Sequence, residues 1–330
     1  MNKLRFALPK GSLNQEGRWS TEELLLQAGF DIRGYSPSSR SYAPKITNDS
    51  VLEAIVDRPQ NMPPELKDGV FDLAILGSDI AEEWKLGGVN LERVCDLEYG
   101  YADLVVAVPV SSQAQDFDSY LEEMSSTDVL RCATEYTLIT QDRVSRSPVF
   151  RTTFGDGKPV MVTKYGLFGD NGRVLVKESY GATESAVNPK ESADFVVETS
   201  QSGESLRKNF LKPVGVWIKS SAGLYTTKEV LEDRWKYNKI QYVKELLQGV
   251  VKSKSTDYII FNLTEKNEQK MLGYLEGEQL FSKTPTITRN DQYIQIGIEV
   301  PKSRWLEVFR SLKQYGAEDI MRIKPTQIIS

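Results

Sequence analysis

The chain has 330 residues, 40% of them hydrophobic, which is enough for two or three packed domains. Its net charge of −5 argues against a protein that binds nucleic acids or membrane surfaces through general positive charge. No apolar run approaches the roughly 20 residues of a membrane span, and the N-terminal stretch is too short and too charged for a signal peptide. We therefore expect a cytoplasmic protein without a nucleic-acid or membrane partner.

Histidine is absent from the sequence, and the only cysteines are Cys95 and Cys132. The lack of histidine excludes Ser-His-Asp and Cys-His catalysis and every metal site with a histidine ligand. Two cysteines cannot build a disulfide framework or a multi-cysteine metal site. Histidine-dependent catalysis and cysteine-rich metal binding are therefore excluded.

The first predicted elements are a strand, a turn and a helix. An apolar strand at residues 4–8 leads into the turn Pro9-Lys10-Gly11-Ser12, and a capping box at residues 20–23 predicts the helix that follows. A second strand at residues 51–56 ends just before Arg58. Ligands collect at the carboxyl ends of strands in an open α/β sheet. A basic side chain at such an end is nevertheless usually solvated, and Lys10 by itself is equally well explained as a surface lysine.

A nearly continuous apolar run at residues 70–76 is typical of a strand buried on both faces. Asp72 interrupts this strand and needs a partner if it is buried, so we expect a structural role for it. Gly77 and Ser78 then open a helix at residues 80–84. Because a helix N-terminus favours negative charge, this helix start is a second candidate anion site.

The middle of the chain combines buried strands with a glycine-rich region. An apolar run predicts a strand at residues 104–109. Between residues 145 and 173, glycines surround a short predicted strand at residues 160–162. We interpret this region as an insertion or a rebuilt hairpin.

The stretch from Ala193 to Leu206 is the most informative part of the chain. A short apolar strand carries Glu198 at its end, a small polar loop is centred on Gly203, and a helix is predicted from Leu206 to Phe210. This arrangement gathers backbone N–H groups and hydroxyls around one concavity, which suits a phosphate. The local pattern by itself favours an ordinary polar turn, because one Ser-Gly pair is a weak signal.

The C-terminal part has the pattern of a separate domain. A strand at residues 214–218 and a long helix at residues 228–251 precede it. Ile294, Ile296 and Ile298 alternate with other residues, as in a half-buried strand. The order βαββαβ is that of a ferredoxin-like sandwich. Its elements are predicted at residues 257–263, 265–274, 285–288, 294–300, 305–312 and 320–329.

The segment from Glu198 to Leu206 resembles the phosphoribosyl-diphosphate loop of the ATP phosphoribosyltransferases, which begin histidine biosynthesis. That loop reads acid, three residues, Ser or Thr, Gly, any residue, Thr and Leu, and here Glu198 replaces the usual Asp and Ser205 the usual Thr. A second block, earlier in the chain, is similar to another family segment and stands in the right order relative to the loop. It comprises residues 58–63 and 68–79. Shorter similar segments lie at residues 9–11, 129–136, 180–184 and 220–224 and, in the long form of the family, at 285–287 and 316–320.

The resemblance implies an α/β fold with a two-lobed, periplasmic-binding-protein-like catalytic part and a C-terminal ferredoxin-like βαββαβ domain. It places catalytic lobe I at residues 1–103 and 212–252. Lobe II, with the phosphoribosyl-diphosphate loop, is expected at residues 104–211. A regulatory domain is expected at residues 253–330.

The resemblance also implies a glycosyltransferase reaction. N1 of the ATP adenine would attack C1 of the phosphoribosyl group and release pyrophosphate, a reaction that depends on charge stabilisation and positioning and needs no histidine. Glu198 is the candidate catalytic residue, beside the ribose hydroxyls. The residues expected to bind phosphoribosyl diphosphate are Glu198, Ser202, Gly203, Glu204, Ser205 and Leu206. Those expected on the nucleotide side are Lys10, Gly11, Arg58, Gly77 and Ser78.

The family also suggests a cofactor, an inhibitor and an assembly. Mg²⁺ is expected, held largely by phosphate and ribose oxygens of the substrates, and no residue is assigned as its ligand. Histidine is the expected feedback inhibitor, bound by the C-terminal domain. The resemblance further implies a homo-oligomer, either a dimer or a hexamer.

Several departures leave alternatives open. Besides the two changes in the loop, Ser12 stands where the family has a common arginine, and Glu191 where it usually has glycine. A carboxylate at Glu204 does not help a phosphate cradle unless it points outward or faces Mg²⁺. The alternatives are a phosphoribosyltransferase with another nitrogen acceptor, and a non-enzymatic ligand-binding or regulatory module.

Overall fold

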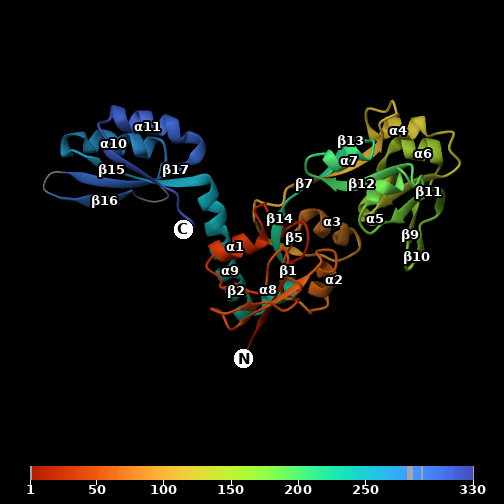
Figure 1. Cartoon of the computed structure of the whole chain (residues 1–330), viewed down its shortest axis with the longest axis horizontal. Helices are drawn as coiled ribbons and strands as arrows, with labels where there is room; N and C mark the ends of the chain where they lie inside the picture. Colours follow the sequence, from red (N-terminus) through yellow and green to blue (C-terminus); the bar gives the residue numbers. More distant parts are fainter. Residues whose placement is uncertain (1, 281–284, 291–292, 330) are drawn as a thin grey trace. The chain divides into compact units, whose positions relative to one another are not determined.

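A computed structural model of the chain describes residues 2–280, 285–290 and 293–329 (Figure 1). The chain divides into two compact units. The first comprises Met1–Thr21 and Arg33–Tyr237, and the second Glu22–Ile32 and Asn238–Ser330. None of the described helices combines the length and apolar composition needed to cross a membrane.

The first sheet of the larger unit is built around β1, which pairs in parallel with β4 on one side and β5 on the other. All five residues of β5 are buried, as the apolar run predicts, but the strand begins at Leu73 rather than at residue 70, and Val70 is 46% exposed. The strand order is β4-β1-β5-β14-β6. The strands are β1 (Leu4–Pro9), β4 (Leu52–Asp57), β5 (Leu73–Gly77), β6 (Glu92–Asp96) and β14 (Ala222–Thr226). The larger unit also contains β3 (Lys45–Ile46), α2 (Met62–Lys67), α3 (Ser78–Leu86) and α8 (Lys228–Glu232). Helix α1 (Thr21–Gln27) belongs to the smaller unit except for its first residue, and β2 (Ile32–Arg33) spans the boundary between the units.

The second sheet has seven strands in the order β10-β9-β11-β8-β12-β7-β13. The glycine-rich region forms a short helix and an antiparallel hairpin of β9 and β10 at one edge of this sheet. The strands are β7 (Ala102–Pro109), β8 (Leu130–Thr134), β9 (Pro159–Thr163), β10 (Gly166–Phe168), β11 (Asn171–Glu178), β12 (Phe195–Ser200) and β13 (Leu211–Ser220). The helices are α4 (Phe117–Glu123), α5 (Thr137–Arg146), α6 (Pro148–Phe154), the 3₁₀ helix η1 (Thr183–Ala186) and α7 (Glu204–Lys208).

The two sheets share one hydrophobic core and are joined by two connections. The chain enters the second sheet with β7, and it returns to the first by passing directly from β13 into β14. Buried side chains from both sheets, among them Ala74 and Val106, belong to one contiguous cluster. This architecture confirms the predicted two-lobed α/β part. The exact lobe boundaries stay a prediction, and in the structure all of β13 lies in the second sheet.

The smaller unit contains a four-stranded antiparallel sheet in the order β16-β17-β15-β18. Helices α10 and α11 lie over one face of this sheet (Figure 1) and bury Met271, Leu275, Val308 and Leu312 against it. This strand order with two helices on one face confirms the predicted ferredoxin-like domain. The elements are α9 (Arg234–Ser255), β15 (Thr256–Leu263), α10 (Glu265–Gly277), β16 (Thr286–Arg289), β17 (Ile294–Pro301), the 3₁₀ helix η2 (Lys302–Arg304), α11 (Trp305–Gln314) and β18 (Glu318–Ile323).

Two other predicted elements differ most in their limits. The long helix predicted at residues 228–251 is broken at Asp233, whose carboxylate accepts the N–H groups of Trp235 and Lys236 at 2.9 and 3.0 Å and so caps the start of α9. The last strand ends at Ile323 rather than at Ile329. Pro325 follows closely and has no N–H group to donate to a neighbouring strand.

Asp72, the residue directly before β5, has the partners that its burial requires. Its side chain is 1% exposed and accepts hydrogen bonds from the backbone N–H of Arg5 at 2.8 Å and from the guanidinium at 3.1 Å. The ammonium of Lys236 donates to it at 2.8 Å. Burial would raise the pKa of Asp72, but the hydrogen bonds from Arg5 and Lys236 outweigh it and lower the pKa. These hydrogen bonds connect β1 and the start of α9 to the residue at which the chain enters β5.

Candidate active site

The larger unit contains a cleft of about 310 Å³ with walls from both sheets. One set of lining residues comes from the loop after β1, from the junction of β5 with α3, and from the segments that connect the two sheets at the start of β7 and the end of β13. The other set comes from the ends of β8 and β12. The residues used below are Ser12, Arg18, Gln60, Gly77, Asp79, Gly100, Glu135, Tyr136, Thr199, Gln201 and Ser220.

The predicted phosphate loop connects β12 to α7 and enters the cleft through Thr199 and Gln201. Gly203 has a φ of +70°, a left-handed conformation that favours glycine, and the space where a Cβ would lie is open. Its N–H donates to the hydroxyl of Ser200 at 3.1 Å. Helix α7 begins at Glu204, two residues earlier than predicted. The loop thus presents an open backbone surface around Gly203.

The side chains of the loop divide into anchors and exposed groups. Leu206 is 2% exposed and packs in a hydrophobic cluster with residues of β7 and β12, so only its backbone can face a ligand. The carboxylate of Glu204 is exposed and pairs with the ammonium of Lys208 at 2.7 Å. This pairing offsets a negative charge that otherwise opposes phosphate binding. Ser202 and Ser205 are exposed, and the hydroxyl of Ser205 donates to Glu184.

Glu198 lies at the base of the loop in a group of carboxylates. It accepts the N–H and the hydroxyl of Thr199 at 2.9 and 3.1 Å. Burial raises the pKa of Glu198, and the nearby carboxylates of Glu135 and Glu184 raise it further against the hydrogen bonds that lower it. Glu135 accepts the N–H of Gly181 at 2.7 Å and the amide of Gln60 at 3.0 Å. A cationic group or a cation entering beside Glu198 would therefore meet a favourable electrostatic environment.

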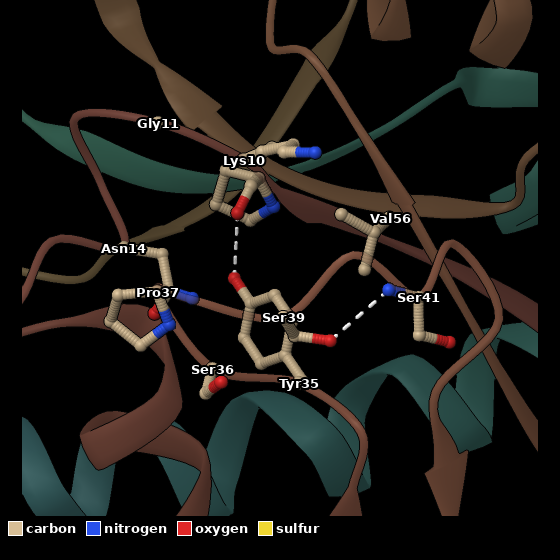
Figure 2. Close-up of a pocket in the computed structure, with 10 residues that line it drawn as sticks. Lys10, Gly11, Asn14, Tyr35, Ser36, Pro37, Ser39, Ser41 and Val56 are labelled. Carbon is tan, nitrogen blue, oxygen red and sulfur yellow. Dashed lines mark hydrogen bonds between the residues drawn. The ribbon is translucent and has the colours of Figure 1, made fainter.

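Lys10 and Gly11 line a narrower pocket at the end of β1 (Figure 2). Its other walls include Asn14, Tyr35 and the serine-rich segment before β3, which contributes Ser36, Ser39 and Ser41. The hydroxyl of Tyr35 donates to the carbonyl of Pro9 at 2.7 Å and fixes this wall (Figure 2). The ammonium of Lys10 lies 4.8 Å from the ring centre of Tyr42. Arg58 follows β4 and is exposed, and its backbone N–H donates to the carboxylate of Asp57 at 2.6 Å.

Gly77 lines the cleft, but the first N–H groups of α3 are engaged within the chain. The N–H of Ser78 donates to the carbonyl of Ser221 at 3.0 Å, and that of Asp79 donates to the Ser220 hydroxyl at 3.2 Å. A Cβ on Gly77 would lie 2.2 Å from a carboxylate oxygen of Asp79, so only glycine leaves room for that side chain. Gly77 and Ser78 thus form the tight connection between β5 and α3 beside the cleft.

Asp79 and Tyr136 are cleft residues that the sequence motifs did not single out. The buried carboxylate of Asp79 accepts the hydroxyl of Tyr136 at 2.5 Å and that of Ser220 at 2.6 Å. Burial and the negative charge of Asp79 raise the pKa of Tyr136, which keeps the hydroxyl protonated as a donor. All three side chains lie within or beside segments similar to the family, but their pairing spans 57 and 141 residues and has no local signal.

Helix α3 also caps α5 through Glu83. The 7% exposed carboxylate accepts the N–H groups of Leu138 and Ile139, both at 2.8 Å, while the residue before α5, Tyr136, gives no side-chain cap. Burial raises the pKa of Glu83 to about 7, although these hydrogen bonds act to lower it. One carboxylate therefore joins a helix of the first sheet to a helix of the second.

The raised pKa of Glu83 predicts a pH-dependent contribution to stability. Between the ordinary value of 4.5 and about 7, the folded chain keeps a proton that the unfolded chain has lost. The contribution is therefore complete below pH 4.5 and declines by about 3 kcal/mol as the pH rises through 7. Urea unfolding across this range is expected to show the decline in the wild type and not in Glu83→Gln. Glu82→Gln, which changes a 45% exposed side chain on the same helix, should keep the decline. A decline that persists in Glu83→Gln would contradict the assignment.

Comparison with known proteins identifies the family. The family model described as ATP phosphoribosyltransferase (HisG) matches residues 58–249. The ATP phosphoribosyltransferase of Prosthecochloris aestuarii is 30% identical over 99% of this chain and 97% of its own length. That of Pelotomaculum thermopropionicum is 28% identical over 99% of each chain.

A solved structure supports the same fold. The ATP phosphoribosyl transferase (HisG:HisZ) complex from Thermotoga maritima aligns with a TM-score of 0.51 and 16% identity, over 74% of this chain and 98% of that chain. The similarity of the relatives extends over the C-terminal domain as well as the two lobes. The chain belongs to the ATP phosphoribosyltransferase family, as a divergent member of the long form, and is an enzyme of the phosphoribosyltransferase class.

Proposed function

We propose that the protein joins N1 of ATP to C1 of phosphoribosyl diphosphate and releases pyrophosphate, as the first step of histidine biosynthesis. The observation that carries this proposal is the loop between Glu198 and Leu206. It has the family spacing, an open left-handed glycine at Gly203, and a position at the edge of a cleft of about 310 Å³. These substrates are consistent with a cytoplasmic enzyme.

The loop residues would hold the phosphoribosyl group. The backbone around Gly203 and the hydroxyls of Ser202 and Ser205 would bind the 5-phosphate, with Leu206 buried beneath them as an anchor. The backbone of Glu204 would complete this cradle, since its carboxylate is paired with Lys208.

Glu198 would act at the reacting carbon. Its carboxylate lies at the base of the loop, where the ribose hydroxyls would follow the 5-phosphate. In an oxocarbenium-like transition state the ribose becomes cationic, and a preorganised carboxylate in a half-buried site stabilises such charge strongly. The raised pKa of Glu198 is consistent with a site that gains from an incoming positive charge.

The nucleotide would occupy the wall formed by the first sheet. Gly77 lies at the cleft with Ser78 next to it in the chain, and Lys10 and Gly11 lie at the pocket after β1. Arg58 is exposed at the end of β4, where its guanidinium is available to a phosphate. Ligands of open α/β sheets bind at these carboxyl ends, which supports the assignment of all five residues.

Mg²⁺ is the proposed cofactor. Among the residues that the structure describes, no group of three or more Cys, Asp or Glu side chains is placed to hold a metal ion by itself. This suits Mg²⁺, which usually keeps several waters and binds through substrate phosphates with one or two carboxylates. Glu198 is the carboxylate that would contribute here. When bound, the ion would neutralise negative charge on the diphosphate.

Release of pyrophosphate from a mixture of the protein, ATP, phosphoribosyl diphosphate and Mg²⁺ tests the reaction. We expect release that depends on both substrates and falls sharply in Glu198→Gln. If pyrophosphate is released with another nitrogen nucleophile but not with ATP, the protein uses a different acceptor. A wild-type protein that binds these substrates without any release would contradict the proposed activity.

We further propose that histidine inhibits the enzyme through the C-terminal domain and that the protein forms a homo-oligomer, a dimer or a hexamer. The domain folds around its own core and contributes none of the residues assigned to the reaction. Feedback requires a coupling between the sites of about 1–3 kcal/mol, which is about a 5- to 150-fold change in substrate affinity.

Inhibition by histidine is expected at millimolar concentration or below. Calorimetry on the full chain should show heat on addition of histidine, and the rate of pyrophosphate release should fall in parallel. Glutamine serves as the control ligand and should do neither. The full chain is preferable to a truncation near Lys254, because Val250 and Val251 at the end of α9 are buried. An active protein with no heat and no inhibition would leave the domain a structural role.

A further inference from the structure

The loop between β1 and α1 has a fixed base. The carbonyl of Leu13 accepts both the N–H and the hydroxyl of Thr21 at 2.9 Å, and the Thr21 hydroxyl lies 2.6 Å from that of Tyr99. The side chain of Leu13 packs so closely on Gly100 that a Cβ there would lie 2.3 Å from it. The residues between Leu13 and Thr21 therefore extend from a buried and hydrogen-bonded base.

Arg18 lies in this loop, is exposed, and lines the cleft. Its guanidinium donates to the side-chain carbonyl of Gln201, which is 183 residues away in the sequence and belongs to the phosphate loop. Among the described residues that line the cleft, Arg18 is the only lysine or arginine. Ser12, on the same side, contributes a hydroxyl and no charge.

The acidic residues of the cleft are already engaged. Asp79 accepts the hydroxyls of Tyr136 and Ser220, and Glu135 accepts hydrogen bonds from Gln60 and Gly181. The guanidinium of Arg18 instead donates to a neutral amide oxygen in the cleft. A phosphate oxygen is the stronger acceptor for guanidinium, because the hydrogen bond is charge-assisted and two N–H groups can bind at once.

We propose that Arg18 binds a phosphate group of the substrate in the cleft, exchanging the amide oxygen of Gln201 for a phosphate oxygen. This inference rests on the proposed function for the identity of the substrate, since both ATP and phosphoribosyl diphosphate bring several phosphates into the cleft. The contact with Gln201 holds the guanidinium at the phosphate loop before the substrate arrives. Arg18 is thus the basic residue that balances substrate charge in a cleft whose other polar groups are hydroxyls, amides and carboxylates.

Binding of simple phosphates to the full-length protein tests Arg18 directly. Calorimetry with inorganic pyrophosphate and with ribose 5-phosphate should show Arg18→Ala to bind at least one of them about ten- to a hundredfold more weakly than the wild type. Arg18→Lys keeps the charge without the planar fork and should fall between the two. Arg151→Ala, a change of an exposed arginine on α6, should leave both affinities unchanged. Whichever probe is affected identifies the phosphate group that Arg18 contacts.

The outcomes separate this inference from the proposed function. Affinities for pyrophosphate, ribose 5-phosphate and ATP that all stay within about threefold in Arg18→Ala, with a thermal unfolding curve like the wild type's, would overturn the assignment of Arg18 even if the enzyme is active. A wild-type protein that releases no pyrophosphate, but loses phosphate affinity in Arg18→Ala, would contradict the reaction and keep the binding residue.

Discussion

Gly203→Val is expected to weaken the binding of phosphoribosyl diphosphate by about a hundredfold. The glycine has a φ of +70°, which a β-branched side chain adopts only with strain. The open space beside its Cα is the space that a phosphate must enter to reach the backbone N–H groups of the loop. The substitution therefore both distorts the loop and fills the position of the ligand. Calorimetry with phosphoribosyl diphosphate and Mg²⁺ measures the loss.

Gly88→Val separates strain from loss of the site. Gly88 has a φ of +82° and equally open surroundings, but it follows α3 and is not assigned to any ligand. Both variants should unfold at a lower temperature than the wild type, whereas only Gly203→Val should lose affinity. Unchanged affinity in a folded Gly203→Val protein would show that the phosphate does not bind at this loop.

The strands and the order of the domains were predictable because their signals are local. The apolar run of β5 and the alternation in β17 follow directly from burial on two faces and on one face. The sequence of strand, polar loop and helix around Gly203 was also predictable, since it lies within one short segment. The phosphate-binding role of this loop stays a prediction. The break at Asp233 has a local cause as well, but a single capping aspartate inside an amphipathic pattern is easily read as a continuous helix.

The contacts that complete the cleft were not predictable from local pattern. Tyr136 reaches Asp79 across 57 residues and Arg18 reaches Gln201 across 183, and neither pair leaves a periodic or spaced motif. The same applies to Glu83, which looks like a solvated helix residue in the sequence and caps α5 in the structure. Such pairings depend on how β7, β13 and β14 connect the two sheets, which is a property of the topology rather than of any segment.

Asp72→Asn is expected to lower the free energy of unfolding by about 3–5 kcal/mol. The carboxylate is 1% exposed and neutralises both Arg5 and Lys236, whose donors surround it at 2.8 to 3.1 Å. An asparagine keeps the size of the side chain but turns an NH₂ group toward these donors and leaves the two cations without a buried countercharge. Urea unfolding followed by circular dichroism measures the change.

Glu53→Gln provides the comparison for Asp72, because it removes an exposed carboxylate on the neighbouring strand β4 that lies 3.5 Å from Lys3. Its cost should stay within about 1 kcal/mol of unfolding free energy.

The lowered pKa of Asp72 determines how the effect of Asp72→Asn depends on pH. A depressed pKa gives stability that is present above the unfolded value of 3.8 and is lost as the pH falls through the folded value. The difference in free energy of unfolding between wild type and Asp72→Asn should therefore be constant from pH 5 to 8. It should shrink in acid, over the pH range in which the carboxylate of Asp72 gains its proton. Equal losses in Asp72→Asn and Glu53→Gln would mean that the buried network contributes no more than an ion pair on the surface.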